Sequence, residues 1–92
     1  MSGHPYDIVV APPAVRAIRE TLPEAVAFAV IDFVTGPLRE NPQRVGAPLR
    51  GELDGIWSAR RGTYRILYRI NEEIREVVIL RVGHRRRIYR ND

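Results

Sequence analysis

Three β-prone runs joined by short polar connections fill most of the second half of the chain and constrain its fold most strongly. The runs cover residues 56–60, 64–70 and 76–82. Arg61-Gly62-Thr63 and Asn71-Glu72-Glu73 separate them, and connections of this length and composition are typical of hairpins. The pattern therefore predicts a small antiparallel sheet.

Alternation within the runs predicts two unlike faces, because successive side chains of a strand point to opposite sides. One face of the run 64–70 is apolar and holds Tyr64, Ile66, Tyr68 and Ile70, while the other holds Arg65, Leu67 and Arg69. Strict alternation in the run 76–82 groups Val78, Leu80 and Val82 on one side and Val77, Ile79 and Arg81 on the other. We expect one face to pack against helices and the other to be apolar but studded with arginines.

The first half of the chain predicts a short strand and two helices. Residues 6–10 are β-prone and stop at Ala11-Pro12-Pro13, where the prolines suit the first turn of a helix. We expect helices over residues 13–20 and 22–35, the second ended by Gly36-Pro37, and a loop over residues 41–51. The fold class is therefore α+β: an N-terminal strand and a helical hairpin packed on one face of a small antiparallel sheet.

Length and composition exclude several classes of protein. Ninety-two residues are too few for two independent cores, so residues 1–92 are expected to form a single domain. Without cysteine there is no disulfide framework and no thiol catalysis. The longest apolar run, residues 25–31, is far shorter than the roughly 20 residues that span a bilayer. With no secretory signal in residues 1–7, we expect a cytoplasmic protein without membrane association.

The charge is unevenly distributed along the chain. All 15 basic residues are arginine, and the net charge is +4. Five arginines face seven acids up to Ile56, whereas ten arginines face four acids from Trp57 onward. Codon bias explains arginine in place of lysine, but it does not explain the crowding into one half. A basic surface of this kind indicates a polyanion or an acidic protein as a partner.

Two arginine clusters are candidates for phosphate binding. The tail after Val82 holds His84, four arginines and Tyr89, and guanidinium groups bind phosphates while a tyrosine ring stacks on bases. Because the tail also contains Ile88, we expect it to dock rather than fray. The hairpin supplies the second cluster, Arg60, Arg65 and Arg69, for which salt bridges to Glu72, Glu73 or Glu76 are the alternative to phosphate binding.

The remaining aromatic and acidic residues suggest no other chemistry. Tyr6, Phe28, Phe33 and Trp57 are expected in the core, with a stacking platform as the alternative for Trp57. No glycine-rich phosphate loop, serine–histidine–aspartate pattern or acidic metal cluster is present, and we expect neither a metal nor a small-molecule cofactor.

The assembled motifs resemble the RelE/ParE superfamily of toxins from type II toxin–antitoxin systems, and the RelE branch more than the ParE branch. The resemblance covers nearly the whole chain and is carried by Gly62-Thr63-Tyr64-Arg65-Ile66-Leu67-Tyr68 and by Val82-Gly83-His84-Arg85-Arg86-Arg87-Ile88-Tyr89. It implies the RelE-like microbial ribonuclease fold. It also implies a ribosome-dependent mRNA endoribonuclease that inhibits translation, arrests growth and is silenced by a RelB-type antitoxin.

The resemblance also implies roles for individual residues. Arg65 corresponds to the arginine that stabilises the transition-state phosphate, Arg85 to the one that helps protonate the departing 5′ oxygen, and Tyr89 to the tyrosine that positions the RNA. The further RNA-binding candidates are six arginines of the hairpin, the last β-prone run and the tail: Arg60, Arg61, Arg69, Arg81, Arg86 and Arg87. The implied reaction is metal-independent attack of the ribose 2′-hydroxyl on the adjacent phosphate.

The sequence departs from the family pattern at two positions. The nuclease pattern has two lysines on the strand before the Gly-x-Tyr-Arg turn, where this chain has Ile56 and Ser58. Histidine is the side chain that ordinarily titrates closest to neutral pH, so His84 is our hypothesis for a substitute base or acid. The alternative is that catalysis rests on positioning by arginines and by the ribosome.

Two other functions and one partner surface follow from the same residues. The ParE branch of the superfamily poisons DNA gyrase, and the lost lysines favour that alternative, while a non-catalytic ribosome- or RNA-binding module is the third. The partners implied are the ribosome, mRNA and the antitoxin. We expect the antitoxin to land on the open face of the sheet, where Leu67, Val77 and Ile79 would lie among the arginines.

Overall fold

A computed structural model describes residues 5–84 and Ile88 and contains one five-stranded sheet. Its order is β1-β5-β4-β3-β2, formed by β1 (Asp7–Val10), β2 (Ala47–Pro48), β3 (Trp57–Arg61), β4 (Tyr64–Asn71) and β5 (Glu76–His84). Strands β2 to β5 pair antiparallel, whereas β1 pairs in parallel with β5. The α+β class is confirmed, and the sheet is mixed because the N-terminal strand joins its edge.

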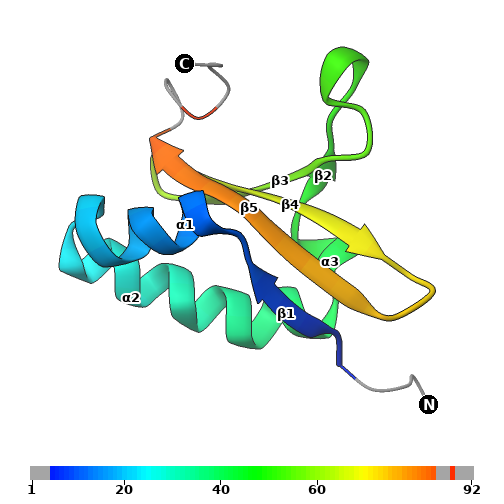
Figure 1. Cartoon of the computed structure of the whole chain (residues 1–92), viewed down its shortest axis with the longest axis horizontal. Helices are drawn as coiled ribbons and strands as arrows, with labels where there is room; N and C mark the ends of the chain where they lie inside the picture. Colours follow the sequence, from blue (N-terminus) through cyan, green and yellow to red (C-terminus); the bar gives the residue numbers. More distant parts are fainter. Residues whose placement is uncertain (1–4, 85–87, 89–92) are drawn as a thin grey trace.

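The helical hairpin lies against one face of the sheet (Figure 1). Its first arm is α1 (Pro12–Arg16), continued by the π-helical turn η1 (Ala17–Thr21). The second arm is α2 (Glu24–Phe33), continued by η2 (Val34–Leu38). The expectation that Gly36-Pro37 ends this arm was wrong. The chain widens into a π-helical turn there, and a wider turn relieves the clash between the Pro37 ring and the preceding turn.

The segment expected to be a loop over residues 41–51 holds two further elements. Its first part is α3 (Pro42–Val45), which begins with a proline in the first helical turn, and its second part is β2, which pairs with β3 over only two residues. The short 3₁₀ turn η3 (Gly51–Leu53) follows. Buried Pro42 is held from the sheet, because the hydroxyl of Tyr68 donates a 2.7 Å hydrogen bond to its carbonyl oxygen.

A β-bulge in β5 changes which of its residues face the helices. Leu67 pairs with Arg81, but the next residue, Tyr68, pairs with Ile79, so Leu80 is the extra residue. Strict alternation was therefore wrong for this strand. Val77 and Ile79 before the bulge and Val82 after it all belong to the core between the sheet and the helices. The expected antitoxin surface accordingly loses Val77 and Ile79, which are both fully buried, and Leu67 is itself only 4% exposed.

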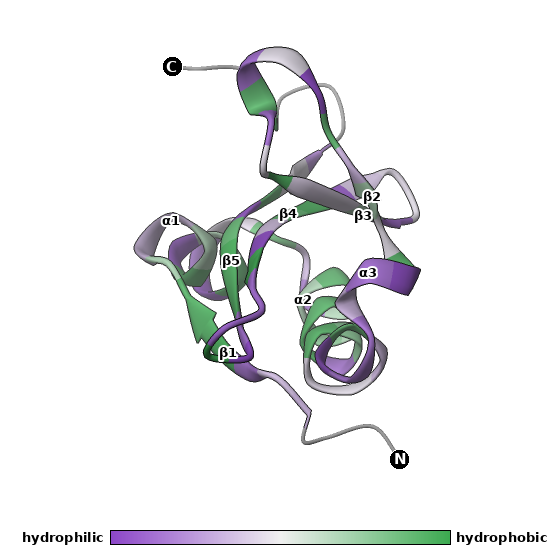
Figure 2. Cartoon of the chain, turned by 90° about the vertical axis from the view of Figure 1, so that its right-hand side faces the viewer, coloured by the Kyte–Doolittle hydropathy of each residue, from purple (hydrophilic) through white to green (hydrophobic). Residues whose placement is uncertain are grey.

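Two aromatic expectations held fully and one failed. Tyr6 and Phe33 are buried in the core, and Trp57 is half-buried and stacks on Tyr68 with ring centres 6.4 Å apart. Phe28, in contrast, is 64% exposed. Because α2 is apolar on most of its sides (Figure 2), the periodicity of its side chains does not identify the side that packs. Among the described residues, no helix is both long and apolar enough to cross a membrane.

Candidate functional site

The site is built on the face of the sheet that is turned away from the helices. In β4, Arg65, Leu67 and Arg69 alternate with the core residues Ile66 and Tyr68. Arg60 of β3 is the register partner of Arg65, and Arg81 of β5 is the register partner of Leu67. Register partners share a face, so four of the arginines singled out in the sequence come together on it. We call Arg60, Arg65, Arg69 and Arg81 the arginine face.

The turn between β3 and β4 fixes this register. Gly62 and Thr63 are the two residues between the strands, and Gly62 has a φ of 60°. A glycine with positive φ at the first position of a two-residue hairpin turn matches the type II′ turn, whose twist suits paired strands. The turn therefore aligns Arg60 with Arg65, and it places the neighbouring Arg61 on the other face.

Arg61 is separated from the arginine face by this alternation. Its guanidinium carbon lies 3.5 Å from the centre of the Phe33 ring, on the helix side of the sheet. One of its terminal nitrogens donates a 2.8 Å hydrogen bond to the carbonyl oxygen of Arg60. The structure thus does not bring Arg61 together with the other hairpin arginines.

Positive charge on the arginine face is not neutralised from within the described part of the chain. No ion pair joins any of its four arginines to a described carboxylate, which excludes the salt bridges to Glu72, Glu73 or Glu76 there. Arg69 lies beside the loop that rises between β2 and β3 (Figure 1), because a Cβ at Gly55 would be 3.2 Å from its guanidinium nitrogen. Four guanidinium groups make this face of the sheet positively charged, and guanidinium groups are in general good donors to phosphate oxygens.

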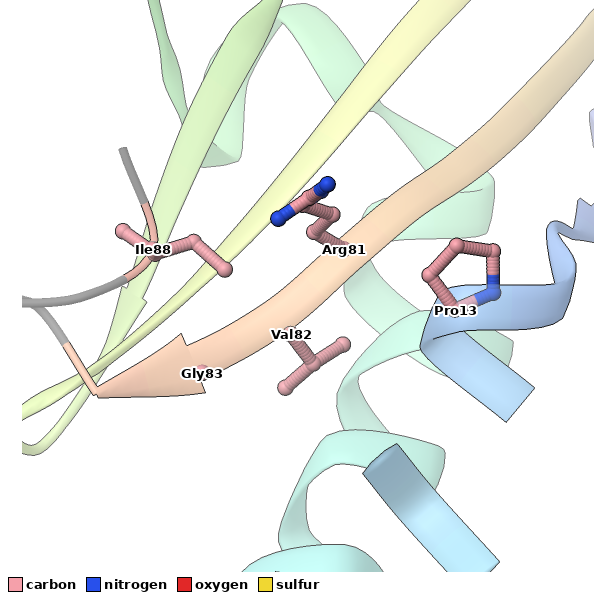
Figure 3. A pocket seen from close by; sticks show the side chains of 5 residues that line it. All are labelled: Pro13, Arg81, Val82, Gly83 and Ile88. Carbon is pink, nitrogen blue, oxygen red and sulfur yellow. The ribbon is translucent and has the colours of Figure 1, made fainter. Parts of the chain in front are cut away.

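The described part of the tail docks on the sheet, as expected for Ile88. This residue is 6% exposed, and its N–H donates a 3.0 Å hydrogen bond to the carbonyl oxygen of His84. It lines a small pocket of about 190 Å³ with Pro13, Arg81, Val82 and Gly83. Figure 3 shows Arg81 and Val82 on opposite sides of β5, with Ile88 beside the end of the strand. The packing of Ile88 on Gly83 was not foreseen from the sequence.

His84 lies on the opposite side of the sheet from Arg65. It pairs with Tyr64 in the register, and the two rings make an edge-to-face contact with centres 5.7 Å apart. Tyr64 precedes Arg65 in β4, so their side chains alternate to opposite faces. The structure therefore does not place His84 among the arginines. The other tail candidates, Arg85, Arg86, Arg87 and Tyr89, lie outside the described residues.

A second polar cluster ties the N-terminus to the turn between β4 and β5. The buried Tyr6 hydroxyl donates a 2.8 Å hydrogen bond to Glu72 and accepts one of 3.3 Å from Arg75. Burial raises the pKa of Tyr6, the hydrogen bond to Glu72 and the charge of that carboxylate raise it further, and Arg75 opposes them. The cluster lies at the end of the sheet opposite the turn between β3 and β4. It holds the segment before β1 against the turn between β4 and β5.

The described residues contain no group of three or more histidine, aspartate or glutamate side chains that could hold a metal ion. The chemistry that the arginine face offers is that of its guanidinium groups. They bind phosphate oxygens in a planar fork and stabilise added negative charge.

Comparison with known proteins assigns this chain to a family. The model of the ParE toxin of type II toxin–antitoxin systems matches residues 11–89. Toxin RelG of Mycobacterium tuberculosis is 52% identical over 86 residues, which cover 94% of this chain and 98% of that protein. This chain belongs to the RelE/ParE family of type II toxins.

Other relatives agree with the toxin assignment. Toxin RelE of the same organism is 44% identical and covers 95% of this chain and 89% of its own length. The crystal structure of the toxin–antitoxin complex RelBE2 from Mycobacterium tuberculosis contains a chain that is 51% identical, with a TM-score of 0.83 over 88% of this chain and 99% of that one. The isolated RelE toxin of Escherichia coli, 19% identical with a TM-score of 0.69 over 95% of this chain and 88% of its own, shares the fold.

Proposed function

We propose that this toxin is an endoribonuclease that cuts mRNA on the ribosome and thereby inhibits translation. The observation that carries the proposal is the pairing of Arg65 with Gly83 in the β4–β5 ladder, two residues before Arg85. This pairing supports a site in which the hairpin and the end of the chain act on one phosphate. The tail candidates Arg86, Arg87 and Tyr89 follow Arg85 directly in the sequence.

The proposed reaction begins with attack of a ribose 2′-hydroxyl on the adjacent phosphorus. A bond forms between the 2′ oxygen and phosphorus as the 2′-hydroxyl proton passes to a base of the ribosome or to water, and the bond from phosphorus to the 5′ oxygen breaks. The products are a 2′,3′-cyclic phosphate and, after protonation, a 5′-hydroxyl. Arg65 would stabilise the additional negative charge on the phosphate oxygens, and Arg85 would help protonate the leaving oxygen. The arginine face would hold the neighbouring phosphates, and no step requires a metal.

The residues at the family lysine positions bear on the source of the base. Ser58 pairs with Leu67 and therefore lies on the same face as Arg65, in line with the register that the resemblance implies. His84 is on the other side of the sheet, beside Tyr64. This arrangement favours catalysis by arginine positioning and by groups of the ribosome over a base supplied by His84. His84→Ala is accordingly expected to keep most of the activity that Arg85→Ala loses.

Mapping mRNA ends in a reconstituted translation reaction tests the proposal. The wild-type toxin is expected to produce stops only on ribosome-engaged message, and a single 2′-deoxy substitution at the cut site is expected to prevent them. Arg65→Ala should slow cleavage by about 10²-fold or more, because it removes a group that stabilises the transition state. Arg16→Ala is a matched control, since Arg16 is exposed on α1, in the helical hairpin on the other side of the sheet.

Inhibition of DNA gyrase is the second candidate function, and the match to the ParE toxin model favours it. A gyrase supercoiling assay with the same protein distinguishes the two. Inhibition of supercoiling without mRNA cleavage would overturn the ribonuclease proposal in favour of gyrase inhibition. Binding to ribosomes with neither activity would indicate a non-catalytic RNA-binding module.

We also infer that a RelB-type antitoxin silences this toxin by covering the arginine face. Four guanidinium groups there lack described carboxylate partners, so an acidic segment would complement them. The affinity of the toxin for such an antitoxin should fall as the salt concentration rises. Arg60→Ala together with Arg69→Ala should weaken the complex, as measured by calorimetry at several salt concentrations.

A further inference from the structure

The contact between Ile88 and Gly83 joins the tail to the strand that pairs with Arg65. A Cβ at Gly83 would lie 3.2 Å from the Cδ1 atom and 4.0 Å from the Cβ atom of Ile88. The side chain of Ile88 therefore rests almost directly on the glycine backbone. Gly83 is in turn the register partner of Arg65. An apolar side chain thus ends beside the arginine that we propose for transition-state stabilisation.

This contact is separate from the main core. Ile88 and Leu67 are 6% and 4% exposed, yet neither belongs to the core cluster beneath the helices. Leu67 lies between Arg65 and Arg69 on the arginine face. Little apolar surface is buried on that face. We therefore expect this burial to hold one segment in place and to contribute little to the stability of the whole fold.

We propose that Ile88 is a positioning residue of the toxin, and that its packing on Gly83 anchors residue 88 on the strand that pairs with Arg65. The proposal rests on the ribonuclease function and extends it. Arg85 directly follows His84, whose carbonyl oxygen accepts the hydrogen bond from Ile88, and Tyr89 directly follows Ile88. Consecutive Cα atoms are 3.8 Å apart, so Tyr89 is one such step from the anchored Ile88, and Arg85 is one step from His84.

Positioning matters because the reaction requires in-line geometry at one phosphate. A displacement of about 1 Å in a catalytic group costs about 10²-fold in rate. Ile88 itself has no group that could take part in the chemistry, so its effect would pass through its neighbours. The expected signature is a lower cleavage rate at saturating ribosomes with nearly unchanged ribosome affinity, because the arginine face that binds the polyanion stays intact.

Ile88→Ala compared with Ile74→Ala tests the role. Ile74 is 58% exposed in the turn between β4 and β5, so the same truncation there serves as a control. We expect Ile88→Ala to lower the single-turnover rate about 10- to 100-fold with KM within about twofold, and Ile74→Ala to leave both unchanged. Circular dichroism and thermal unfolding of both variants establish that the fold is kept.

A crowding and rescue experiment tests the contact itself. Gly83→Ala adds a Cβ against Cδ1 of Ile88 and should slow cleavage, although alanine is otherwise better suited than glycine to a strand. Ile88→Val removes Cδ1, and the next atom of residue 88 is 4.0 Å from the added Cβ. We expect Ile88→Val alone to retain most activity and the double variant Gly83→Ala/Ile88→Val to recover most of what Gly83→Ala loses.

The outcomes separate this inference from the function on which it rests. Wild-type protein that cuts no ribosome-bound mRNA overturns the ribonuclease function and the positioning role together. Wild-type cleavage that Arg65→Ala abolishes, together with equal rates for Ile88→Ala and Ile74→Ala, overturns the positioning role alone. A double variant as slow as Gly83→Ala also overturns it, because the loss would then not come from contact with Ile88.

Discussion

The guanidinium group of Arg61 is packed on the Phe33 ring, whereas the adjacent Arg60 lies on the arginine face. Two consecutive arginines of one strand thus serve opposite sides of the sheet. The cation–π contact of Arg61 joins β3 to the end of α2 and is a stabilising interaction. Arg60 has no such contact among the described residues and is exposed.

Alanine substitution of these two arginines should separate binding from stability. Arg60→Ala is expected to weaken ribosome or RNA binding and to reduce the slope of log K against log salt by about 1. Arg61→Ala is expected to lower the free energy of unfolding by about 1 kcal/mol and to leave that slope unchanged. Salt titrations of binding and urea unfolding provide the two measurements, and the same slope loss in both variants would contradict the assignment to opposite faces.

Gly46→Ala should destabilise the fold. A Cβ at Gly46 would overlap the Tyr68 hydroxyl and lie 2.8 Å from the carbonyl oxygen of Ser58. Overpacking of this kind costs about 1 to 3 kcal/mol. Gly36→Ala is the control, because apart from its chain neighbours its Cβ would meet nothing within 4 Å. Thermal unfolding should move down for the first variant and by much less for the second.

Tyr6→Phe should destabilise the end of the sheet that carries the β4–β5 turn. The hydroxyl is buried and hydrogen-bonded to Glu72, Arg75 and Gln43, so its removal takes one hydrogen bond from each of these groups. The expected loss is about 1 kcal/mol in urea unfolding. Tyr64→Phe, whose ring contacts His84 at the other end of β4, should stay within about 0.5 kcal/mol. Equal effects would show that the hydroxyl of Tyr6 contributes little.

Stability should fall in alkaline solution because of Tyr68. Burial raises the pKa of Tyr68 to about 12, so the folded protein keeps the phenolic proton in a range where the unfolded chain has lost it. Its contribution is therefore complete below about pH 10, the ordinary pKa of tyrosine, and is lost as the pH rises to about 12. Urea unfolding from pH 8 to 11.5 should show a smaller decline for Tyr68→Phe than for wild type. Parallel declines would contradict this origin.

Much of the candidate site follows from the local pattern of the sequence. The alternation of the sequence predicts that Arg65, Leu67 and Arg69 share a face, and the structure agrees. The register of the β3–β4 hairpin adds Arg60 to that face. The apolar character of Ile88 likewise indicates docking. These predictions succeed because they depend on strand parity and hairpin geometry, which are properties of neighbouring residues.

Features that depend on distant partners required the tertiary structure. The bulge at Leu80 reverses which side chains of β5 face the helices after that residue. No local signal in the sequence marks the bulge, because both sets of alternating side chains in this strand are mainly apolar. The exposure of Phe28 escapes prediction for a similar reason, since α2 offers several apolar sides and only the sheet selects one.

The sequence by itself determined the toxin family, the two hairpins and the concentration of arginine in the second half of the chain. Only the tertiary structure decided that β1 pairs in parallel with β5 and that Ile88 packs on Gly83. It also decided that Arg61 and His84 lie on the side of the sheet opposite the arginine face. The physical reason is that periodicity specifies alternation within a segment. Which side is buried, and against which partner, is decided by packing between segments that are far apart in the chain.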